Sequence, residues 1–433
     1  MEASKEAGAV LNALQQRAVD LAAVDKRNVF LTGPGGTGKS FVLAALRARL
    51  REEGLSHRVC ASTGVAALGV GGCTVHSLLG TGIASRVREA RRCAANSGTV
   101  EWIHRRLVGV DVVVIDEVSM LSGDYVDMMD WWLRRVMDSS SLFGGKQLVF
   151  VGDFLQLPPV EKDVVFERTF GFQADAWRAA DVATVELERS YRQSDQAMVD
   201  ALNRIRYGVL DDEARDLFAP CVGRGLEDPT RLCATNAAAR SVNLRRLLQL
   251  QGREHHYRAT ATGFGKTAEA NARRVVKSVI ADEQLQLKVD APVLTLVNDT
   301  LGDYVNGSRA IVLECRQASA VVRVEATGRE VEVGRHTWEM LDGNGRTAAT
   351  FSQLPLRLAW AMTIHKSQGM SLDRVAVDLS GVFERGQAYV ALSRARSLEG
   401  LSLDVPLEPR AVFAHPEIVA FYRSSPGSTT PLV

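Results

Sequence analysis

The chain has 433 residues, a length that corresponds to about two to four domains with sizeable hydrophobic cores. Hydrophobic residues make up 46% and charged residues 24%, as in globular proteins, and no apolar run is long enough to cross a bilayer. The 52 basic and 51 acidic residues give a net charge of +1, so any binding of nucleic acid must use local basic surfaces.

The N-terminal residues and the cysteines both predict an intracellular protein. The first residues lack the charged, apolar and small-residue order of a secretory signal, and Glu2 and Glu6 disfavour a mitochondrial transit peptide. No two of the six cysteines form a C-x-x-C pair, which favours free thiols in a reducing compartment over a metal site or disulfides. We expect the nucleus or mitochondrion in a eukaryote and the cytoplasm in a bacterium.

A phosphate-binding loop lies at residues 33–40. After a first helix that begins near Leu11, with Asn12 as its cap, the apolar residues 28–31 predict a strand, and residues 41–50 have helical spacing. Between them the sequence matches G-x-x-x-x-G-K-[ST]. In such a loop, glycine N–H groups surround phosphate oxygens, Lys39 reaches the β- and γ-phosphates, and Ser40 holds Mg²⁺. This pattern predicts binding of a nucleoside triphosphate. The residues predicted to bind it here are Gly33, Gly35, Gly36, Thr37, Gly38, Lys39 and Ser40.

Small and hydroxyl residues follow a second predicted strand at residues 57–61. Residues 62–67 and 71–77 suit close approach to a sugar-phosphate backbone, and an ordinary strand-to-helix loop is an equally good interpretation. The stretch 83–106 contains six arginines and two glutamates together with Trp102. It is interpreted either as a solvated helical face or as an insert that contacts nucleic acid.

A second acidic motif completes the predicted nucleotide site. Residues 110–115 form a continuous apolar run that ends in Asp116 and Glu117, which is typical of a buried parallel strand. Together with the phosphate loop this is a Walker B site, in which Asp116 holds Mg²⁺ and Glu117 orients or activates the attacking water. Gln156 follows the next buried strand, at residues 146–151, and is placed to sense the γ-phosphate.

The second half of the chain predicts another α/β domain with a β-rich insertion. Strands are expected near residues 182–187, 231–236, 356–360 and 375–378, with a helix at 386–396. Helical patterns are absent from residues 255–350, where β-type runs alternate with turn signals such as those at 306–307 and 342–345. Residues 424–433 are expected to be a disordered tail.

The order of these motifs resembles that of superfamily-one DNA helicases of the PIF type (petite integration frequency), subfamily B. The resemblance extends from about Leu11 to Tyr422, and residues 117–135 look like the signature that separates this family from RecD and phage relatives. The matching motifs, in order, are Gln15, residues 33–40, 61–64, 72–77, 116–120, 152–159, 191–193, 363–369 and 389–394.

The resemblance implies a role for each motif residue. Gln15 reads adenine, Tyr191 stacks on it, and Gly369 contributes to the nucleotide site. Arg192 and Arg394 are arginine fingers supplied by the second domain, a contribution that is typically about 10³–10⁵ in rate; the alternative for each is a surface salt bridge. Most members of the family look more Phe-like at the Tyr191 position. The implied contacts to single-stranded DNA are Ser62, Thr63, His76, Thr235, Asn236, Thr363, His365 and Lys366.

The implied fold is α/β, with two tandem RecA-like P-loop domains. Domain one comprises residues 1–74 and 107–172, with a wedge insert at 75–106. Domain two comprises residues 173–254 and 351–423, with an SH3-like β-barrel insert at 255–350. The long N-terminal regulatory region and extended C-terminal domain of some members have no counterpart, so the chain is interpreted as a bare motor or a truncated core, which weighs against telomere-specific or mitochondrial roles.

The implied activity is an ATP- and Mg²⁺-dependent DNA helicase with 5′→3′ polarity. Its expected partners are single-stranded DNA and forked or tailed duplex, with G-quadruplex and RNA–DNA hybrid as further candidates. It is expected to be a monomer in isolation and to have no membrane partner. The family acts in replication, repair, recombination and telomere maintenance. Three alternatives stay open: a RecD-type or phage-type helicase, a translocase that does not separate strands, and a non-catalytic DNA-binding module regulated by nucleotide.

Overall fold

The computed structural model divides the chain into two units. The first comprises Met1–Val209 together with Phe413–Val433, and the second comprises Leu210–Val412. No helix in the described part of the chain is long and apolar enough to span a membrane. The residues that the structure describes are 10–63, 66–67, 70, 73–81, 86–94, 97–159, 166–265, 267–279, 281–297, 299, 301–304, 308–325, 327–341 and 347–424.

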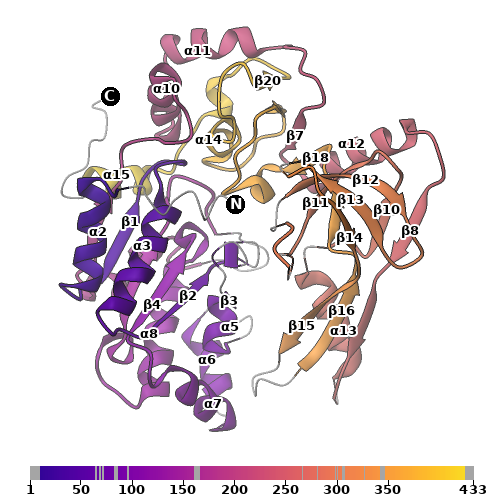
Figure 1. The fold of residues 1–433 in the computed structure, drawn as a ribbon. Helices are drawn as coiled ribbons and strands as arrows, with labels where there is room; N and C mark the ends of the chain where they lie inside the picture. Colours follow the sequence, from indigo (N-terminus) through magenta and orange to yellow (C-terminus); the bar gives the residue numbers. More distant parts are fainter. Residues whose placement is uncertain are drawn as a thin grey trace. The chain divides into compact units, whose positions relative to one another are not determined.

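The first unit is built on a six-stranded sheet whose neighbouring strands all pair in parallel (Figure 1). The strand that precedes the phosphate loop, β1, lies between β5 and β6, so one strand separates it from β4, which ends in Asp116. In spatial order the strands are β3 (Cys73–Thr74), β2 (His57–Ala61), β4 (Val112–Asp116), β5 (Gln147–Val151), β1 (Val29–Thr32) and β6 (Ala183–Glu186).

Both faces of this sheet are buried, which explains the continuous apolar runs of its strands. Successive side chains point to opposite faces, so Val112 and Val114 join one core and Val113 and Ile115 the other. Helices α2 (Ala13–Ala23) and α3 (Lys39–Glu52) cover the first face with buried residues such as Val19 and Leu46. The predicted first helix is confirmed, and Asn12 caps it in a reciprocal capping box with Gln15.

Helices from distant parts of the sequence pack on the other face of the sheet. The predicted wedge segment, residues 75–106, contributes Leu79, Ala90 and Ile103 to this core, and Leu79 accepts a 2.9 Å hydrogen bond from the indole of Trp132. The described helices of this segment are therefore packed into the first unit. The helices that contribute to this core are α5 (Val75–Leu79), α6 (Val87–Ala94), α7 (Ser97–Leu107), α8 (Gly123–Met137), α9 (Asp175–Ala179) and α15 (Pro416–Ser424).

The first unit extends beyond the predicted boundary at residue 172, and that boundary is corrected here. Strand β6 pairs with β1 along its whole length, and α10 (Gln196–Arg206) follows it within the same unit. Helix α15 also belongs to this unit and not to the second, where residues 351–423 were predicted to lie.

The second unit contains a smaller parallel sheet, as the repeated strand–helix pattern predicted. Helix α12 is fixed against this sheet because the Asn243 amide makes two 2.8 Å hydrogen bonds with the backbone of Ala361. In spatial order the strands are β18 (Ala361–Thr363), β7 (Thr230–Cys233), β19 (Val375–Val377) and β20 (Leu401–Leu403). The helices of this part are α11 (Asp212–Phe218), α12 (Asn236–Gln249) and α14 (Gln387–Leu392).

The strands described in the β-rich insertion pair antiparallel, and two predictions for this region are wrong. Helix α13 (Ala268–Ser278) lies within it, although no helix was predicted there, and packs Val275 with Ala349 and Phe351. The strand β17 (Leu356–Leu358) pairs with β11 in the antiparallel sheet and was wrongly assigned to the α/β part. The sheets comprise β14 (Glu330–Val333), β13 (Ala320–Val324), β12 (Arg309–Cys315), β11 (Pro292–Thr295) and β17; β15 (His336–Leu341), β16 (Thr347–Gln353) and β9 (Thr260–Gly263); and β10 (Gln284–Leu287) with β8 (His255–Arg258).

Two kinds of sequence prediction remain, namely those for the C-terminal tail and the turns, and that for the cysteines. The expected tail beyond Ser424 and the turn signals at 306–307 and 342–345 lie outside the described residues. Cys60, Cys73, Cys221, Cys233 and Cys315 are free thiols, as predicted.

Candidate nucleotide and nucleic-acid sites

The phosphate loop connects β1 to α3 in the conformation that its glycines permit. Gly33, Gly36 and Gly38 have φ values of +133°, +88° and +87°. The Lys39 ammonium donates to the carbonyl oxygens of Gly33 and Pro34 at 2.7 and 2.9 Å, which holds its side chain back over the loop. Ser40 is exposed in the first turn of α3. The loop therefore gathers backbone N–H groups, a helix N-terminus and a cation at one place.

The segment that follows β6 packs directly on this loop. A Cβ atom at Gly33 would collide with the carbonyl oxygen of Leu187, and one at Gly36 would come within 2.5 Å of the Arg192 Cβ. The N–H of Tyr191 donates to the Gly36 carbonyl at 2.8 Å. Glycine is required at both positions because the loop is bent and also covered at close range.

Asp116 and Glu117 lie where β4 ends, at the same edge of the sheet as the loop. Glu117 has left-handed backbone dihedrals, φ 52° and ψ 47°, an uncommon and strained conformation for a residue with a side chain. Its N–H donates to the Asp116 carboxylate at 2.8 Å. Burial, followed by the nearby charge of Glu117, raises the pKa of Asp116 to about 7. A pair of carboxylates crowded in this way is suited to a cation.

The Lys39 ammonium experiences the charges of several groups in the first unit. Burial is the largest cause that lowers its pKa, while the carboxylates of Asp153 and Glu117 act to raise it, and Arg206 and Arg192 act to lower it. These influences indicate that the groups from the ends of β4, β5 and β6 converge near the loop.

Gln15 and Tyr191, the predicted adenine contacts, lie beside each other at the base of the loop. Gln15 is buried, and its amide donates to the Thr37 carbonyl at 3.4 Å. Tyr191 is 53% exposed, accepts a 3.1 Å hydrogen bond from Asn12, and has the Arg189 guanidinium 5.2 Å from its ring centroid. A rigid amide next to an exposed ring is suited to the edge and the face of a base.

The structure corrects the placement of Arg192. This residue was predicted to be a finger from the second domain, but it lies in the first unit, where its segment follows β6 and covers the phosphate loop. Its charge also acts on Lys39. Arg192 is thus a component of the same half-site as Lys39.

Arg394 lies in the second unit, as predicted, and is almost fully buried there. Its guanidinium donates to the carbonyls of Val390 and Met370 at 2.8 and 3.1 Å and to the Ser393 hydroxyl at 2.8 Å. It therefore ties the end of α14 to the segment after β18 that contains Gly369, whose φ is +80°. In this structure Arg394 organises its own unit.

The first-unit residues fit a nucleoside triphosphate and a hard divalent cation. The loop provides N–H groups and Lys39 for phosphate oxygens, and the Ser40 hydroxyl and Asp116 carboxylate are oxygen ligands of the kind that Mg²⁺ prefers. No group of three or more His, Cys, Asp or Glu side chains gathers as a metal site among the described residues.

Three predicted DNA contacts lie in the first unit, at the ends of β2 and β3. The Ser62 hydroxyl donates to the Glu117 carbonyl at 2.7 Å, so Ser62 links this edge to the Walker B segment. The Thr63 hydroxyl caps the turn that follows, accepting from the Ala66 N–H. His76 packs against Tyr125 with ring centroids 4.6 Å apart, and burial lowers its pKa to about 4. His76 is therefore neutral at pH 7 and offers a hydrogen bond without charge.

The other five predicted DNA contacts gather in the second unit, where the neighbouring strands β7 and β18 end. Thr235 and Asn236 are exposed at the start of α12, which Thr235 caps. Thr363 ends β18 directly opposite Cys233 of β7, and His365 and Lys366 follow in a short 3₁₀ helix, Ile364–Ser367. Burial, reinforced by the positive charge of Arg357, lowers the pKa of Lys366 to about 8.

A buried polar cluster beside the phosphate loop was not predicted from the sequence. Asp153 is fully buried and accepts hydrogen bonds from Arg206 and Tyr422, and Arg206 also pairs with Glu186. These partners lie 53 and 269 residues from Asp153 along the chain. No spacing rule in a single sequence connects them.

Comparison with known proteins places these features in a family. A family model described as PIF1-like helicase matches residues 4–213, and a second helicase model matches residues 337–419. The ATP-dependent DNA helicase Pif1 of Bdellovibrio bacteriovorus is 35% identical over 402 residues, which are 92% of this chain and 89% of that protein. The chain belongs to the PIF1-like helicase family.

Further PIF1-like relatives come from animals and fungi. The human ATP-dependent DNA helicase PIF1 is 38% identical over 94% of this chain but only 63% of the human protein. The chain spans under two thirds of the length of the vertebrate relatives, from 61% in Xenopus laevis to 63% in zebrafish, rat and human.

Solved PIF1-like structures have the same fold. The crystal structure of Pif1 helicase from Candida albicans superposes with a TM-score of 0.85 at 32% identity, covering 96% of this chain and 99% of that one. A structure of Pif1 from Bacteroides in complex with ADP-AlF3 and single-stranded DNA gives a TM-score of 0.76 at 31% identity, covering 97% and 99%. These likenesses confirm the two-part α/β architecture predicted from the sequence.

Proposed function

We propose that this chain is an ATP- and Mg²⁺-dependent DNA helicase that moves 5′→3′ along single-stranded DNA and separates duplex strands. The observation that supports this most strongly is the convergence of Lys39, Asp116 and Glu117 at one sheet edge of a PIF1-like chain. Relatives named ATP-dependent DNA helicase and a Pif1 structure holding ADP-AlF3 and single-stranded DNA give further support.

The first unit would bind and hydrolyse the nucleotide. The glycine loop and Lys39 would hold the phosphates, Ser40 and Asp116 would hold the cation, and Gln15 and Tyr191 would position the base. When bound, Mg²⁺ would neutralise charge on the β- and γ-phosphates. Glu117 would orient the attacking water and Gln156 would contact the γ-phosphate, while Arg192 would act from the same unit and Arg394 would contribute from the second.

Each unit would hold DNA through its own set of contacts. In the first unit, Ser62 joins the predicted DNA edge to the Glu117 carbonyl, so a change at the catalytic carboxylate can reach the DNA edge through one hydrogen bond. In the second unit, Lys366 and Arg357 lie close enough to influence each other's charge, and Thr235 and Asn236 are exposed. Forked and tailed duplex would be the principal substrates, with G-quadruplex and RNA–DNA hybrid to be tested. The protein would be a monomer in isolation and would act inside the cell in replication, repair or recombination.

Substitution of Lys39 tests the ATPase. We expect Lys39→Ala to abolish ATP hydrolysis stimulated by single-stranded DNA and to leave single-strand binding largely unchanged, because Lys39 lies in the phosphate loop and apart from the predicted DNA contacts. Hydrolysis at the wild-type rate in this variant would contradict the assignment of the site.

A panel of tailed substrates tests the helicase itself. The wild-type chain should separate a 5′-tailed duplex and fail on a 3′-tailed one in the presence of ATP and Mg²⁺. Hydrolysis with displacement of a bound protein but no strand separation would identify a translocase. An absence of ATPase activity with intact DNA binding would identify a nucleotide-regulated binding module instead.

A further inference from the structure

The carboxylate of Asp153 is the centre of a buried network in the first unit. Arg206 donates to it twice, from Nε to Oδ2 at 3.0 Å and from a terminal nitrogen to Oδ1 at 2.9 Å. Oδ1 also accepts from the Leu155 N–H at 3.1 Å and from the Tyr422 hydroxyl at 3.2 Å. The Gln156 amide reaches Oδ2 at 3.5 Å. Asp153 thus organises the loop that contains Gln156.

The Tyr422 hydroxyl joins two strand ends. It lies 2.6 Å from the Thr32 hydroxyl at the end of β1 and accepts the Phe154 N–H at 3.2 Å. A phenol hydroxyl can donate one hydrogen bond, and that of Tyr422 donates to the Asp153 carboxylate. The Thr32 hydroxyl must therefore be the donor in the short contact. Burial raises the pKa of Tyr422 well above its usual value, which keeps the phenol protonated. One oxygen therefore connects the residue before the phosphate loop with the loop after β5.

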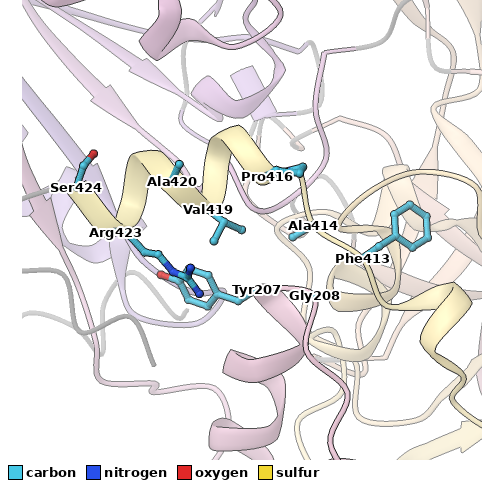
Figure 2. A pocket seen from close by; sticks show the side chains of 9 residues that line it. All are labelled: Tyr207, Gly208, Phe413, Ala414, Pro416, Val419, Ala420, Arg423 and Ser424. Atoms are coloured by element: carbon cyan, nitrogen blue, oxygen red, sulfur yellow. The ribbon is translucent and has the colours of Figure 1, made fainter. Parts of the chain in front are cut away.

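Arg206 and Tyr422 stand at the two places where the chain passes between the units. Arg206 ends α10 just before Val209, and Tyr422 lies in α15, which follows Phe413. The two connecting segments touch within the first unit, since a Cβ at Gly208 would come within 2.7 Å of the Ala414 nitrogen. They border an open hollow of about 710 Å³, where Tyr207 and Gly208 face Val419 of α15 (Figure 2).

The network also sets the charge around Lys39. Asp153 is the strongest of the groups that favour the charged ammonium, and Arg206 opposes it. The bidentate contact with Arg206 compensates part of the Asp153 charge.

We propose that Tyr422 and Arg206 are positioning residues for ATP hydrolysis, which hold the Gln156 loop at a fixed place relative to the phosphate loop. This inference rests on the proposed function. Helix α15, which is formed by the last described residues of the chain, thereby supports the nucleotide site. None of its residues is proposed to contact the nucleotide.

The test is Tyr422→Phe, which removes one oxygen and leaves the packing in place. ATP hydrolysis is measured with and without single-stranded DNA. We expect kcat to fall roughly tenfold, the equivalent of one hydrogen bond to a charged group, with KM for ATP changed by less than about threefold. The matched control is Tyr257→Phe in the second unit, whose buried hydroxyl donates to the Arg316 carbonyl at 2.9 Å. It should lose stability without a change in kcat.

Thr32→Val provides a second, independent variant. If the Thr32 and Tyr422 hydroxyls act as one unit, the double variant Thr32→Val with Tyr422→Phe should lose little more kcat than either single variant. A Tyr422→Phe protein with kcat within about twofold of wild type, or two effects that multiply in the double variant, would overturn the inference. A wild-type chain without DNA-stimulated ATPase would instead refute the proposed function.

Discussion

Replacing Arg206 by methionine should destabilise the first unit more than any change to a surface ion pair. The Arg206 side chain is 2% exposed and that of Asp153 is 0% exposed, and Glu186 also contacts the guanidinium at 3.1 Å. Methionine retains much of the volume but leaves two carboxylates without their cation in a dry environment. Breaking a buried pair on one side typically costs about 3–5 kcal/mol. That is a large share of a total domain stability of about 5–15 kcal/mol.

Two further variants separate the cost of the uncompensated charge from the cost of lost packing. Arg27→Met breaks a 2.8 Å pair with Asp181 in which the side chains are 43% and 93% exposed, and it should cost about 0–1 kcal/mol. The double variant Arg206→Met with Asp153→Leu removes the fully buried carboxylate as well as its cation, while Glu186 still loses its partner. It should therefore recover part of the stability lost in the single variant. We expect both the single and the double Arg206→Met variants to lack ATPase activity, because the loop that contains Gln156 loses its hydrogen bonds to Asp153 or the position that these bonds fix.

Urea unfolding followed by tryptophan fluorescence measures these differences, since four of the six tryptophans lie in the first unit. A chain with two units can unfold in two transitions, so the free energy is taken from the transition that Arg206→Met shifts. The reasoning is refuted if Arg206→Met costs no more than Arg27→Met, or if the double variant is less stable than Arg206→Met alone.

Two other predictions concern Lys366 and Gly33. Because burial and Arg357 lower the pKa of Lys366 to about 8, with Asp282 acting in the opposite direction, its charge is complete below about pH 7 and is lost as pH rises through 8. Single-strand affinity measured by fluorescence anisotropy should therefore fall between pH 7 and 9, and this fall should disappear in Lys366→Arg; an unchanged pH profile would exclude a DNA contact there. Gly33→Ala should weaken ATP binding more than tenfold and cost on the order of 1–3 kcal/mol, because φ is +133° and the methyl group would collide with the Leu187 carbonyl. Gly109→Ala, where an added Cβ meets nothing within 4 Å, is its control and should bind ATP as the wild type does.

The parts of the site that were predicted from the sequence are those determined by local pattern. The phosphate loop requires glycines between a strand and a helix, and the apolar run before Asp116 requires a strand buried on both faces. Each of these requirements can be recognised within a stretch of about ten residues. The structure has β1, α3 and β4 where they were expected. The Asn12–Gln15 capping box at the start of α2 is equally local.

The domain boundary and Arg192 were misplaced because parallel pairing leaves little trace in a sequence. Strand β6 has only four residues, and its partner β1 lies about 150 positions earlier, so its pattern is compatible with either unit. Once β6 is at the edge of the first sheet, Leu187 and Tyr191 bond to the strand end and the loop, and Arg192 must follow them. The unit to which Arg192 belongs is decided by this pairing and not by its motif.

Helix α15 shows why the remaining part of the site could not be predicted. Its amphipathic pattern accounts for a helix that buries Ile418 and Tyr422, but a buried tyrosine hydroxyl needs a partner that the pattern does not name. The partners are Thr32, Asp153 and Phe154, which the fold brings to one point only after the chain has completed the second unit and returned. The buried Asp153 carboxylate accepts hydrogen bonds from both Arg206 and Tyr422. It therefore links α10 to α15 within the first unit. In the proposed mechanism, chemistry at the phosphate loop depends on the same few hydrogen bonds that hold Arg206 and Tyr422 in place.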